Sequence, residues 1–232
     1  MHLFIEIGQF SEKYYEIDFF DEVCRKSIIE MNEKISGVIL AGGAGKRLGG
    51  VTKSRLQVNG TTIVSRIIST IEEFFAEILI VTNRPEEFRE HGNRRIIRDE
   101  YQKIGPLGGI HAALKSASSE AIFVFAGDMP LLQKEIIRSQ INEYEKQKPQ
   151  ILIPRYGKLI EPLHSIYNIS LLPALEKFIL ENRNNAVREF FNHINVMYFD
   201  VGDSERTRDA FMNINSPEDI ILAEKILKNR NP

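Results

Sequence analysis

Short apolar runs alternate with longer stretches of helical periodicity from residue 37 onward. The apolar runs are continuous, as in residues 78–81 and 122–125, and lack the polar–apolar alternation of a half-exposed strand. Continuous apolar strands are typical of a sheet that is buried on both faces. We therefore predict buried strands at residues 37–41, 77–82, 95–98, 121–126 and 150–154.

The segments between these runs have the character of helices. We predict helices at residues 62–75, 85–91, 108–116 and 133–146, then at 170–181 and 186–193, followed by a strand at 195–200. A last helix is expected from Ser216, because Ser216, Pro217 and Asp219 form a capping box with proline in the first helical position. Strands that alternate with helices predict an α/β fold: one three-layer α/β/α domain around a mostly parallel, Rossmann-like sheet.

The first 36 residues do not share this pattern. Aromatic and acidic side chains are mixed there, without a glycine-rich loop or an alternation of strands and helices. Tyr15, Phe19 and Val23 recur at helical spacing, which predicts one or two helices within residues 11–32. We interpret residues 1–36 as an N-terminal extension, with a regulatory or dimer-forming arm as the alternative, and residues 37–232 as the main domain.

The composition argues against a nucleic-acid-binding, disulfide-rich or membrane-spanning protein. The chain has 232 residues with 30 basic and 32 acidic side chains, so there is no basic surplus for binding nucleic acid. Its single cysteine, Cys24, excludes an intramolecular disulfide framework. No apolar stretch approaches the roughly 20 residues that span a bilayer, and the N-terminus does not have the form of a secretory signal. We expect a cytoplasmic protein without membrane or nucleic-acid partners.

A glycine-rich loop follows the first predicted strand. Five glycines lie within residues 42–50, and Lys46, Arg47 and Lys53 add positive charge, which suits a phosphate-rich ligand. Two common phosphate motifs do not fit. A Walker A loop would need glycine in place of Leu40 and a hydroxyl residue in place of Arg47, and the dinucleotide fingerprint would need glycine in place of Leu48. Composition alone leaves a flexible structural loop as the alternative.

The full string of this loop resembles the signature of the molybdenum cofactor guanylyltransferases. The residues that carry the resemblance are Leu40, Ala41, Gly42, Gly43, Arg47, Leu48, Gly49, Gly50 and Lys53. Residues 105–110, 125–130 and 213–219 are similar to three further motifs of the same family, in the same order. The resemblance extends from residue 37 to about residue 227. One departure is Thr52, which stands where family members commonly have an acidic residue.

The resemblance implies a nucleotidyltransferase that moves GMP from GTP to the terminal phosphate of molybdopterin and releases pyrophosphate. It implies Mg²⁺ as cofactor, held by Asp128, and a catalytic set of Arg47, Lys53 and Asp128. The implied nucleotide-binding residues are Leu40, Ala41, Gly42, Gly43, Lys53, Asn83, Asp99 and Asp128. GTP and molybdopterin are the implied small-molecule partners, with transient contact to proteins that mature molybdoenzymes as a further expectation.

Several of these residues also have an ordinary structural interpretation. Asp128 ends an apolar strand, where a carboxylate suits a hard cation such as Mg²⁺, but aspartate is also common in turns. Asp99 has the same turn-forming alternative. Asn83 contacts the nucleoside or else caps the helix that begins at Pro85. Asn213 and Asn215 are second-rank candidates near the metal.

Glu161 and the histidines have no assigned role in the site. Glu161 lies where the resemblance places the acceptor; it contacts the pterin or, as we favour, is a solvated loop acid. The five histidines show no metal-ligand spacing, and none is assigned a role.

Two rival functions remain open. Related enzymes use CTP with the same pterin, or GTP with adenosylcobinamide phosphate; the pair Gly42 and Gly43 favours the guanine-specific pattern. The second rival is a non-catalytic regulator that keeps the fold and binds a nucleotide. The presence of Lys53 and Asp128 argues against this regulator.

Overall fold

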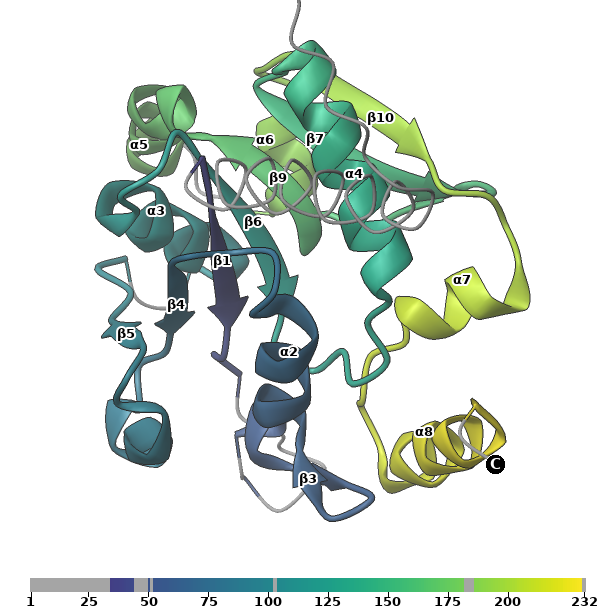
Figure 1. Ribbon diagram of the computed structural model, residues 1–232. Coiled ribbons are helices and arrows are strands. Elements are labelled where there is room, and N and C mark those ends of the chain that lie inside the picture. The colour runs from purple at the N-terminus through teal and green to yellow at the C-terminus, as the bar shows by residue number, and fades with distance from the viewer. Residues whose placement is uncertain (1–33, 44–49, 51, 102–103, 182–185, 231–232) are drawn as a thin grey trace, which may run out of the picture.

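An eight-stranded sheet forms the centre of the computed structural model, which describes residues 34–43, 50, 52–101, 104–181 and 186–230. Seven strands follow the order β10-β7-β9-β6-β1-β4-β5 (Figure 1), and β8 pairs with β7. The strands are β1 (Ile35–Leu40), β4 (Ile78–Val81), β5 (Arg95–Ile97), β6 (Ala121–Ala126), β7 (Ile151–Tyr156), β8 (Leu159–Ile160), β9 (His164–Asn168) and β10 (Val196–Asp200). The predicted α/β architecture is confirmed, and β1 begins before residue 37, where we placed the start of the main domain.

The sheet is mostly parallel, with one antiparallel strand in its middle. Strands β5, β4, β1 and β6 run parallel to one another, as do β7 and β10. Strand β9 lies between β6 and β7 and runs antiparallel to both. We predicted no strand at β9. Its residues include the polar His164 and Ser165, which are nevertheless fully buried because the sheet is covered on both sides.

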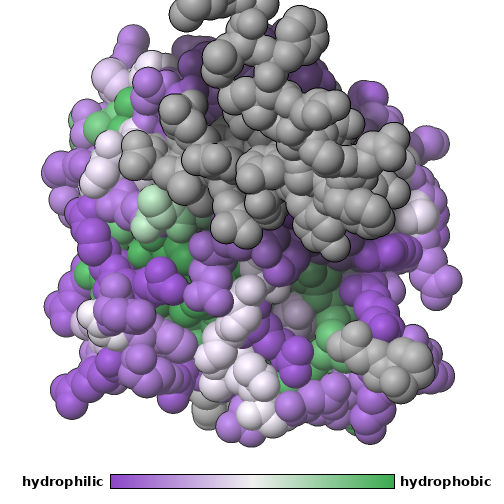
Figure 2. Space-filling view, viewed as in Figure 1, coloured by the Kyte–Doolittle hydropathy of each residue, from purple (hydrophilic) through white to green (hydrophobic). Residues whose placement is uncertain are grey.

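Helices cover both faces of the sheet, as expected from the continuous apolar strands. On one face, α2 (Ile63–Ile71), α4 (Lys134–Gln147) and α8 (Pro217–Arg230) contribute to a core with inward side chains of β1 and β6. On the other face, α3 (Pro106–Ser116), α5 (Leu172–Glu181) and α6 (Val187–Phe191) form a second core. Among the residues that Figure 2 colours, hydrophilic side chains predominate on this face and hydrophobic ones form smaller patches. None of the described helices combines the length and the apolar character that a membrane span requires.

Smaller elements complete the chain. They are the 3-10 helices η2 (Lys53–Arg55), η3 (Pro85–His91) and η4 (Ile169–Leu171), helix α7 (Glu205–Ala210), and a hairpin of β2 (Gln57–Val58) and β3 (Thr61–Thr62). The helix predicted at residues 85–91 is therefore present, but as a 3-10 helix with a kink at Phe88. The helix predicted within residues 11–32 lies outside the described residues.

The last helix begins as its sequence predicts. The carboxylate of Asp219 accepts hydrogen bonds from the backbone N–H of Ser216 at 2.8 Å, and the Ser216 hydroxyl accepts one from the Asp219 N–H at 3.4 Å. The same carboxylate also accepts the N–H of Asn215 at 2.7 Å. This capping box therefore fixes Asn215, which precedes the helix, as well as the first turn of the helix.

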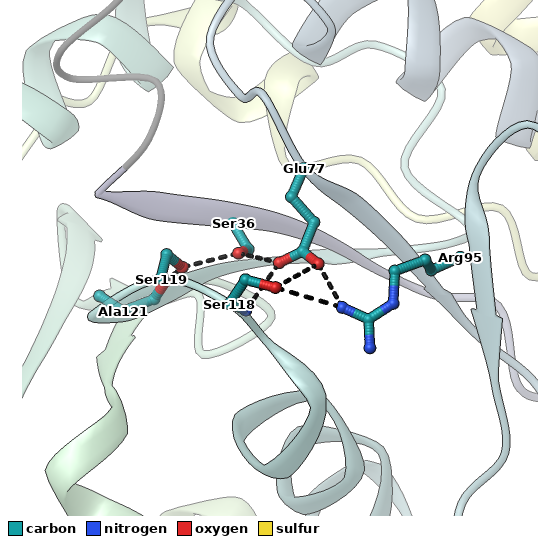
Figure 3. A network of polar contacts seen from close by, with 6 residues as sticks. All are labelled: Ser36, Glu77, Arg95, Ser118, Ser119 and Ala121. Atoms are coloured by element: carbon teal, nitrogen blue, oxygen red, sulfur yellow. Dashed lines mark hydrogen bonds and ion pairs between the residues drawn. The ribbon is translucent and has the colours of Figure 1, made fainter.

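A polar network joins the amino ends of the central strands (Figure 3). Glu77, just before β4, accepts hydrogen bonds from the Ser36 hydroxyl at 2.5 Å, from the Ser118 N–H at 2.9 Å and from the guanidinium of Arg95. The Ser36 hydroxyl also lies 2.6 Å from that of Ser119. The network ties β1, β4, β5 and the turn before β6 together, which leaves the opposite, carboxyl ends of these strands to form a site.

Candidate active site

A cavity of about 360 Å³ opens beyond the carboxyl ends of β1, β4 and β6. Strand order reverses here, since the chain passes from β1 to β4 and β5 on one side and then returns to β6 on the other. Loops diverge at such a point in a parallel sheet, which makes it the usual place for a ligand. The lining residues are Leu40, Gly42, Gly43, Lys53, Val81, Thr82, Asn83, Asp99, Gly105, Pro106, Gly109, Ala126, Gly127, Asp128 and Leu163.

Three polar side chains from distant segments meet where Lys53 and Asp128 line this cavity. The ammonium of Lys53, from η2, lies 3.0 Å from Oδ2 of Asp128, which follows β6, and donates to Oδ1 of Asn215 at 2.6 Å. The Lys53 and Asp128 side chains are 22% and 21% exposed, so their charges are partly shielded from water and still open to a ligand. Of the two asparagines weighed from the sequence, Asn215 joins this cluster, whereas Asn213 donates to the carbonyl of Phe211.

The backbone around Asp128 is fixed by two strands and by the C-terminal segment. Gly127 donates its N–H to the Leu40 carbonyl at 3.0 Å, and a Cβ atom at Gly127 would lie 2.7 Å from that oxygen. Only glycine therefore lets β6 end this close to β1. The Asp128 carbonyl accepts the N–H of Ile214 at 2.9 Å, which brings Asn215 to the cluster.

The described part of the glycine-rich loop contributes backbone to the cavity. Leu40, Gly42 and Gly43 line it, while Ala41 is buried and donates its N–H to the Val81 carbonyl at 2.9 Å. Gly43 has a φ of 108°, which L side chains rarely adopt, so glycine is needed at this turn. The predicted catalytic residue Arg47 lies outside the described residues.

Asn83 and Asp99 lie on the side of the cavity next to β4 and β5. Asn83 is not the cap of η3, because Arg84 holds the N-cap position and its N–H is bound by the hydroxyl of Thr82 at 3.1 Å. Asp99 is partly buried, and burial raises the pKa of its carboxyl above the ordinary value. Its Oδ1 atom is buried without a hydrogen-bond partner among the described residues, which suits it to accept a donor from a ligand.

Thr52, the departure from the family pattern, is buried and has a specific partner. Its hydroxyl donates to the carboxylate of Glu87 on η3, and this bond is the main cause that lowers the pKa of Glu87, with Arg84 adding to it. A carboxylate therefore lies beside position 52 although the residue there is neutral.

Glu161 lies in a loop, as expected, but its side chain is half-buried and not fully solvated. Burial raises its pKa to about 7, and the negative charge of Asp128 acts in the same direction, while Arg188 opposes it. Its carboxylate accepts the N–H of Leu163, a residue that lines the cavity, at 3.4 Å. No local sequence pattern indicates this burial, because it depends on the turn that leads into the unpredicted strand β9.

The donor set fits magnesium held together with a nucleotide. Asp128 and Asn215 offer a carboxylate and an amide oxygen, the hard ligands that Mg²⁺ takes. No group of three or more histidine, cysteine, aspartate or glutamate side chains suited to a metal converges among the described residues. Mg²⁺ typically completes its shell with water and substrate phosphates, so one carboxylate beside a glycine-rich loop matches its chemistry.

Comparison with known proteins agrees with this geometry. Residues 37–196 match the family model described as the MobA-like NTP transferase domain. The chain is 33% identical over 205 residues to a protein of Natranaerobius thermophilus named probable molybdenum cofactor guanylyltransferase, covering 85% of this chain and 98% of that protein. A protein of Thermococcus kodakarensis with the same name is 33% identical over 202 residues, covering 84% and 97%.

Solved structures give the same result. Molybdopterin-guanine dinucleotide biosynthesis protein A of Archaeoglobus fulgidus superposes with a TM-score of 0.71 at 28% identity, over 84% of this chain and 99% of that one. The 4-diphosphocytidyl-2C-methyl-D-erythritol synthase of Anaerococcus prevotii, at 18% identity and a TM-score of 0.63 over 85% and 99%, shares the fold alone. The chain therefore belongs to the MobA-like NTP transferase family.

Proposed function

We propose that this enzyme transfers GMP from GTP to the terminal phosphate of molybdopterin and releases pyrophosphate, which forms the guanine dinucleotide cofactor. The observation that carries the proposal is the cluster of Lys53, Asp128 and Asn215 beside the glycine-rich loop. The names of relatives that match over most of the chain supply the substrates. Contact with proteins that mature molybdoenzymes belongs to the same proposal.

In the proposed reaction, a phosphate oxygen of the acceptor forms a bond to the α-phosphorus of GTP. The bond from that phosphorus to the oxygen that bridges to the β-phosphorus breaks, and its electron pair leaves with pyrophosphate. A phosphate nucleophile is already ionised near neutral pH, so no general base is needed. Alignment and neutralisation of charge are then the main tasks of the protein.

The residues of the cavity suit these tasks. Gly42 and Gly43 line the cavity, so we assign their backbone N–H groups to the triphosphate. Lys53, which lies 3.0 Å from Asp128 at the same cavity, is assigned to the charge at the α-phosphate. Asp128, with Asn215 beside it, is the residue that would hold Mg²⁺. When bound, this ion supplies positive charge to the phosphate oxygens of donor and acceptor. We assign Arg47 to the departing pyrophosphate and Asn83 and Asp99 to the nucleoside.

Substrate choice is tested by turnover of GTP, CTP and ATP with molybdopterin and with adenosylcobinamide phosphate. We expect GTP with molybdopterin to be the best pair. A wide preference for CTP would instead make the chain a cytidylyltransferase of the same fold, and a preference for the cobinamide acceptor would replace the pterin.

The catalytic class is tested with Asp128→Ala. Pyrophosphate release is expected to disappear while circular dichroism shows an intact fold, and Asp200→Ala, an exposed aspartate on β10, serves as the matched control. If the unaltered protein released no pyrophosphate with any of these substrate pairs, the non-catalytic regulator would be the correct function.

A further inference from the structure

A histidine is buried beside the cavity, although no role was assigned to it from the sequence. His111, on α3, is 1% exposed, and its Nε2 lies 3.1 Å from Oε1 of Glu176 on α5. Its neighbours along α3, Ile110 and Ala112, belong to the apolar core between the sheet and these helices. Burial of an imidazole in such a core is unfavourable unless the ring is hydrogen-bonded. Glu176 therefore holds His111 in a defined orientation.

The same histidine reaches the nucleotide side of the cavity through Tyr101. The two rings meet edge to face, with centroids 4.8 Å apart. The backbone N–H of Tyr101 in turn donates to the carboxylate of Asp99, which lines the cavity. A continuous chain of contacts thus runs from Glu176 through His111 and Tyr101 to Asp99.

Asp99 also lies directly on the helix that carries the histidine. A Cβ atom at Gly108 would be 2.5 Å from both carboxylate oxygens of Asp99, so the carboxylate rests on the helix backbone one turn before His111. Oδ1 of Asp99 and Nδ1 of His111 are both buried without a hydrogen-bond partner among the described residues.

We propose that His111, oriented by Glu176, is a positioning residue that sets the place of Asp99 for nucleotide binding. His111 does not itself line the cavity, so it acts through Tyr101 and Asp99. The group that Asp99 receives is a hydrogen-bond donor of the nucleoside, since its free oxygen is an acceptor. The proposal rests on the proposed function only in taking a nucleotide as the ligand.

A positioning role for the nucleoside predicts a change in KM rather than in kcat. In His111→Phe the ring still packs on Tyr101, but both nitrogens are lost. We expect the KM for GTP to rise about tenfold, the scale of one hydrogen bond to a charged group, with kcat within about threefold. His111→Gln keeps an amide donor for Glu176 and is expected to restore part of the loss.

The matched control is Lys115→Gln. Lys115 lies one turn further along α3 and forms an exposed ion pair with Glu100, at 2.9 and 2.8 Å, so it joins the same helix to the same loop. Exposed pairs contribute little, and we expect the KM to stay within about twofold. An equal rise in KM for Lys115→Gln and His111→Phe would overturn the proposal, because any tether of the loop would then have the same effect.

A second measurement separates this proposal from the proposed function. Hydrogen exchange of residues 98–101 is followed without nucleotide in the same variants, with Glu176→Gln as a further variant should His111→Phe not fold. We expect faster exchange in His111→Phe and Glu176→Gln and no change in Lys115→Gln. If the unaltered protein used no nucleotide but exchange still rose, positioning of Asp99 would stand and the proposed function would fall. Unchanged exchange together with unchanged KM would overturn the proposal.

Discussion

Lys53 is the only described side chain that donates hydrogen bonds to both Asp128 and Asn215. The effect of its positive charge can be tested separately from the effect of its size. Lys53→Met keeps most of the side-chain volume and removes the charge. We predict a fall of about 100-fold or more in kcat/KM, because preorganised charge at a phosphoryl-transfer site is of that importance. The thermal midpoint should change by only a few degrees.

The control for this variant is Lys134→Met, which breaks an exposed ion pair with Glu73. Steady-state kinetics and thermal melting are measured for both variants. Equal activities in the two would contradict the role of Lys53.

Glu161 gives a prediction about pH. Its folded-state pKa of about 7 is above the ordinary value of 4.5, chiefly through burial and then through Asp128. Between these two pH values the folded state binds more protons than the unfolded state, so stability falls as the pH rises. Glu161→Gln removes this titration. The free energy of unfolding of the variant, minus that of the parent, is expected to increase by roughly 2 kcal/mol from pH 5 to pH 8.

Denaturant unfolding in the absence of Mg²⁺, at pH 5 and at pH 8, measures this difference. Glu189→Gln, which alters an exposed side chain on α6, is the control. A stability difference between parent and Glu161→Gln that stayed constant with pH would contradict the raised pKa.

At the residue level, motif residues were easier to predict than residues defined by burial. Lys53, Asp128 and Asp99 follow strands or a glycine-rich loop, so local sequence indicates that they lie at the carboxyl edge of the sheet. His111 and Glu161 lack such a signal, because their burial comes from α5 and from the turn before β9. Whether the predicted residues bind the nucleotide and Mg²⁺ remains a prediction.

Among the elements, α8 serves the site through its first turn. Asp219 accepts the N–H groups of Asn215 and Ser216, so it holds the residue that contacts Lys53. Asp219→Ala should cost about 1 kcal/mol in stability, as for a lost helix cap. We also predict a fall of about tenfold in kcat/KM, since Asn215 would no longer be fixed.

Glu218→Ala changes the adjacent exposed acid of the same turn and is the matched control. Activity is compared at a temperature where both variants are folded. Similar activities in the two would show that the cap supports the helix alone.

The strand ends opposite the site are joined through Glu77 (Figure 3). Burial would raise its pKa, but hydrogen bonds from Ser118, Ser36 and Arg95 together lower it below the ordinary value. The stabilisation is therefore present above about pH 4.5 and is lost as the pH falls through the lower, folded-state pKa. Glu77→Gln should lower the free energy of unfolding at pH 7 by about 1–3 kcal/mol and leave kcat unchanged.

Urea unfolding at pH 7 and at pH 3.5 checks this prediction, with the exposed Glu120→Gln as control. A loss of stability that is as large at pH 3.5 as at pH 7, or a loss of kcat in the folded variant, would contradict a purely structural role for the network.

Strands with continuous apolar runs and helices with a long, regular apolar pattern were predicted most accurately. The six strands and the longer helices that were predicted are all present, with ends that differ by a few residues. The hairpin of β2 and β3 was missed although Asn59 and Gly60 form its turn with φ of 48° and 71°, a pair typical of tight hairpins. Strand β9 was missed for a different reason: buried polar side chains such as His164, bound by Gln140, do not look like a strand interior.

On the scale of the whole molecule, the site is an assembly of segments from most of the domain. The contact between Lys53 and Asn215 joins residues 162 positions apart, and that between Lys53 and Asp128 joins residues 75 apart. The two helical layers and the mostly parallel sheet were predictable from the alternation of strands and helices. The contacts of Lys53 with Asn215 and Asp128 were not predictable, because they depend on strand order and on the return of the C-terminal segment to β6.

The antiparallel strand β9 also has a consequence for synthesis on the ribosome. Within the described sheet, the group β5-β4-β1-β6 connects to the group β7-β10 only through β9. Strand β6 ends at Ala126 and β9 starts at His164, so one edge of the fully apolar β6 has no partner while the intervening residues are translated. An open apolar edge is a template for pairing with other chains. A nascent chain halted in this interval should be the form that most needs a chaperone.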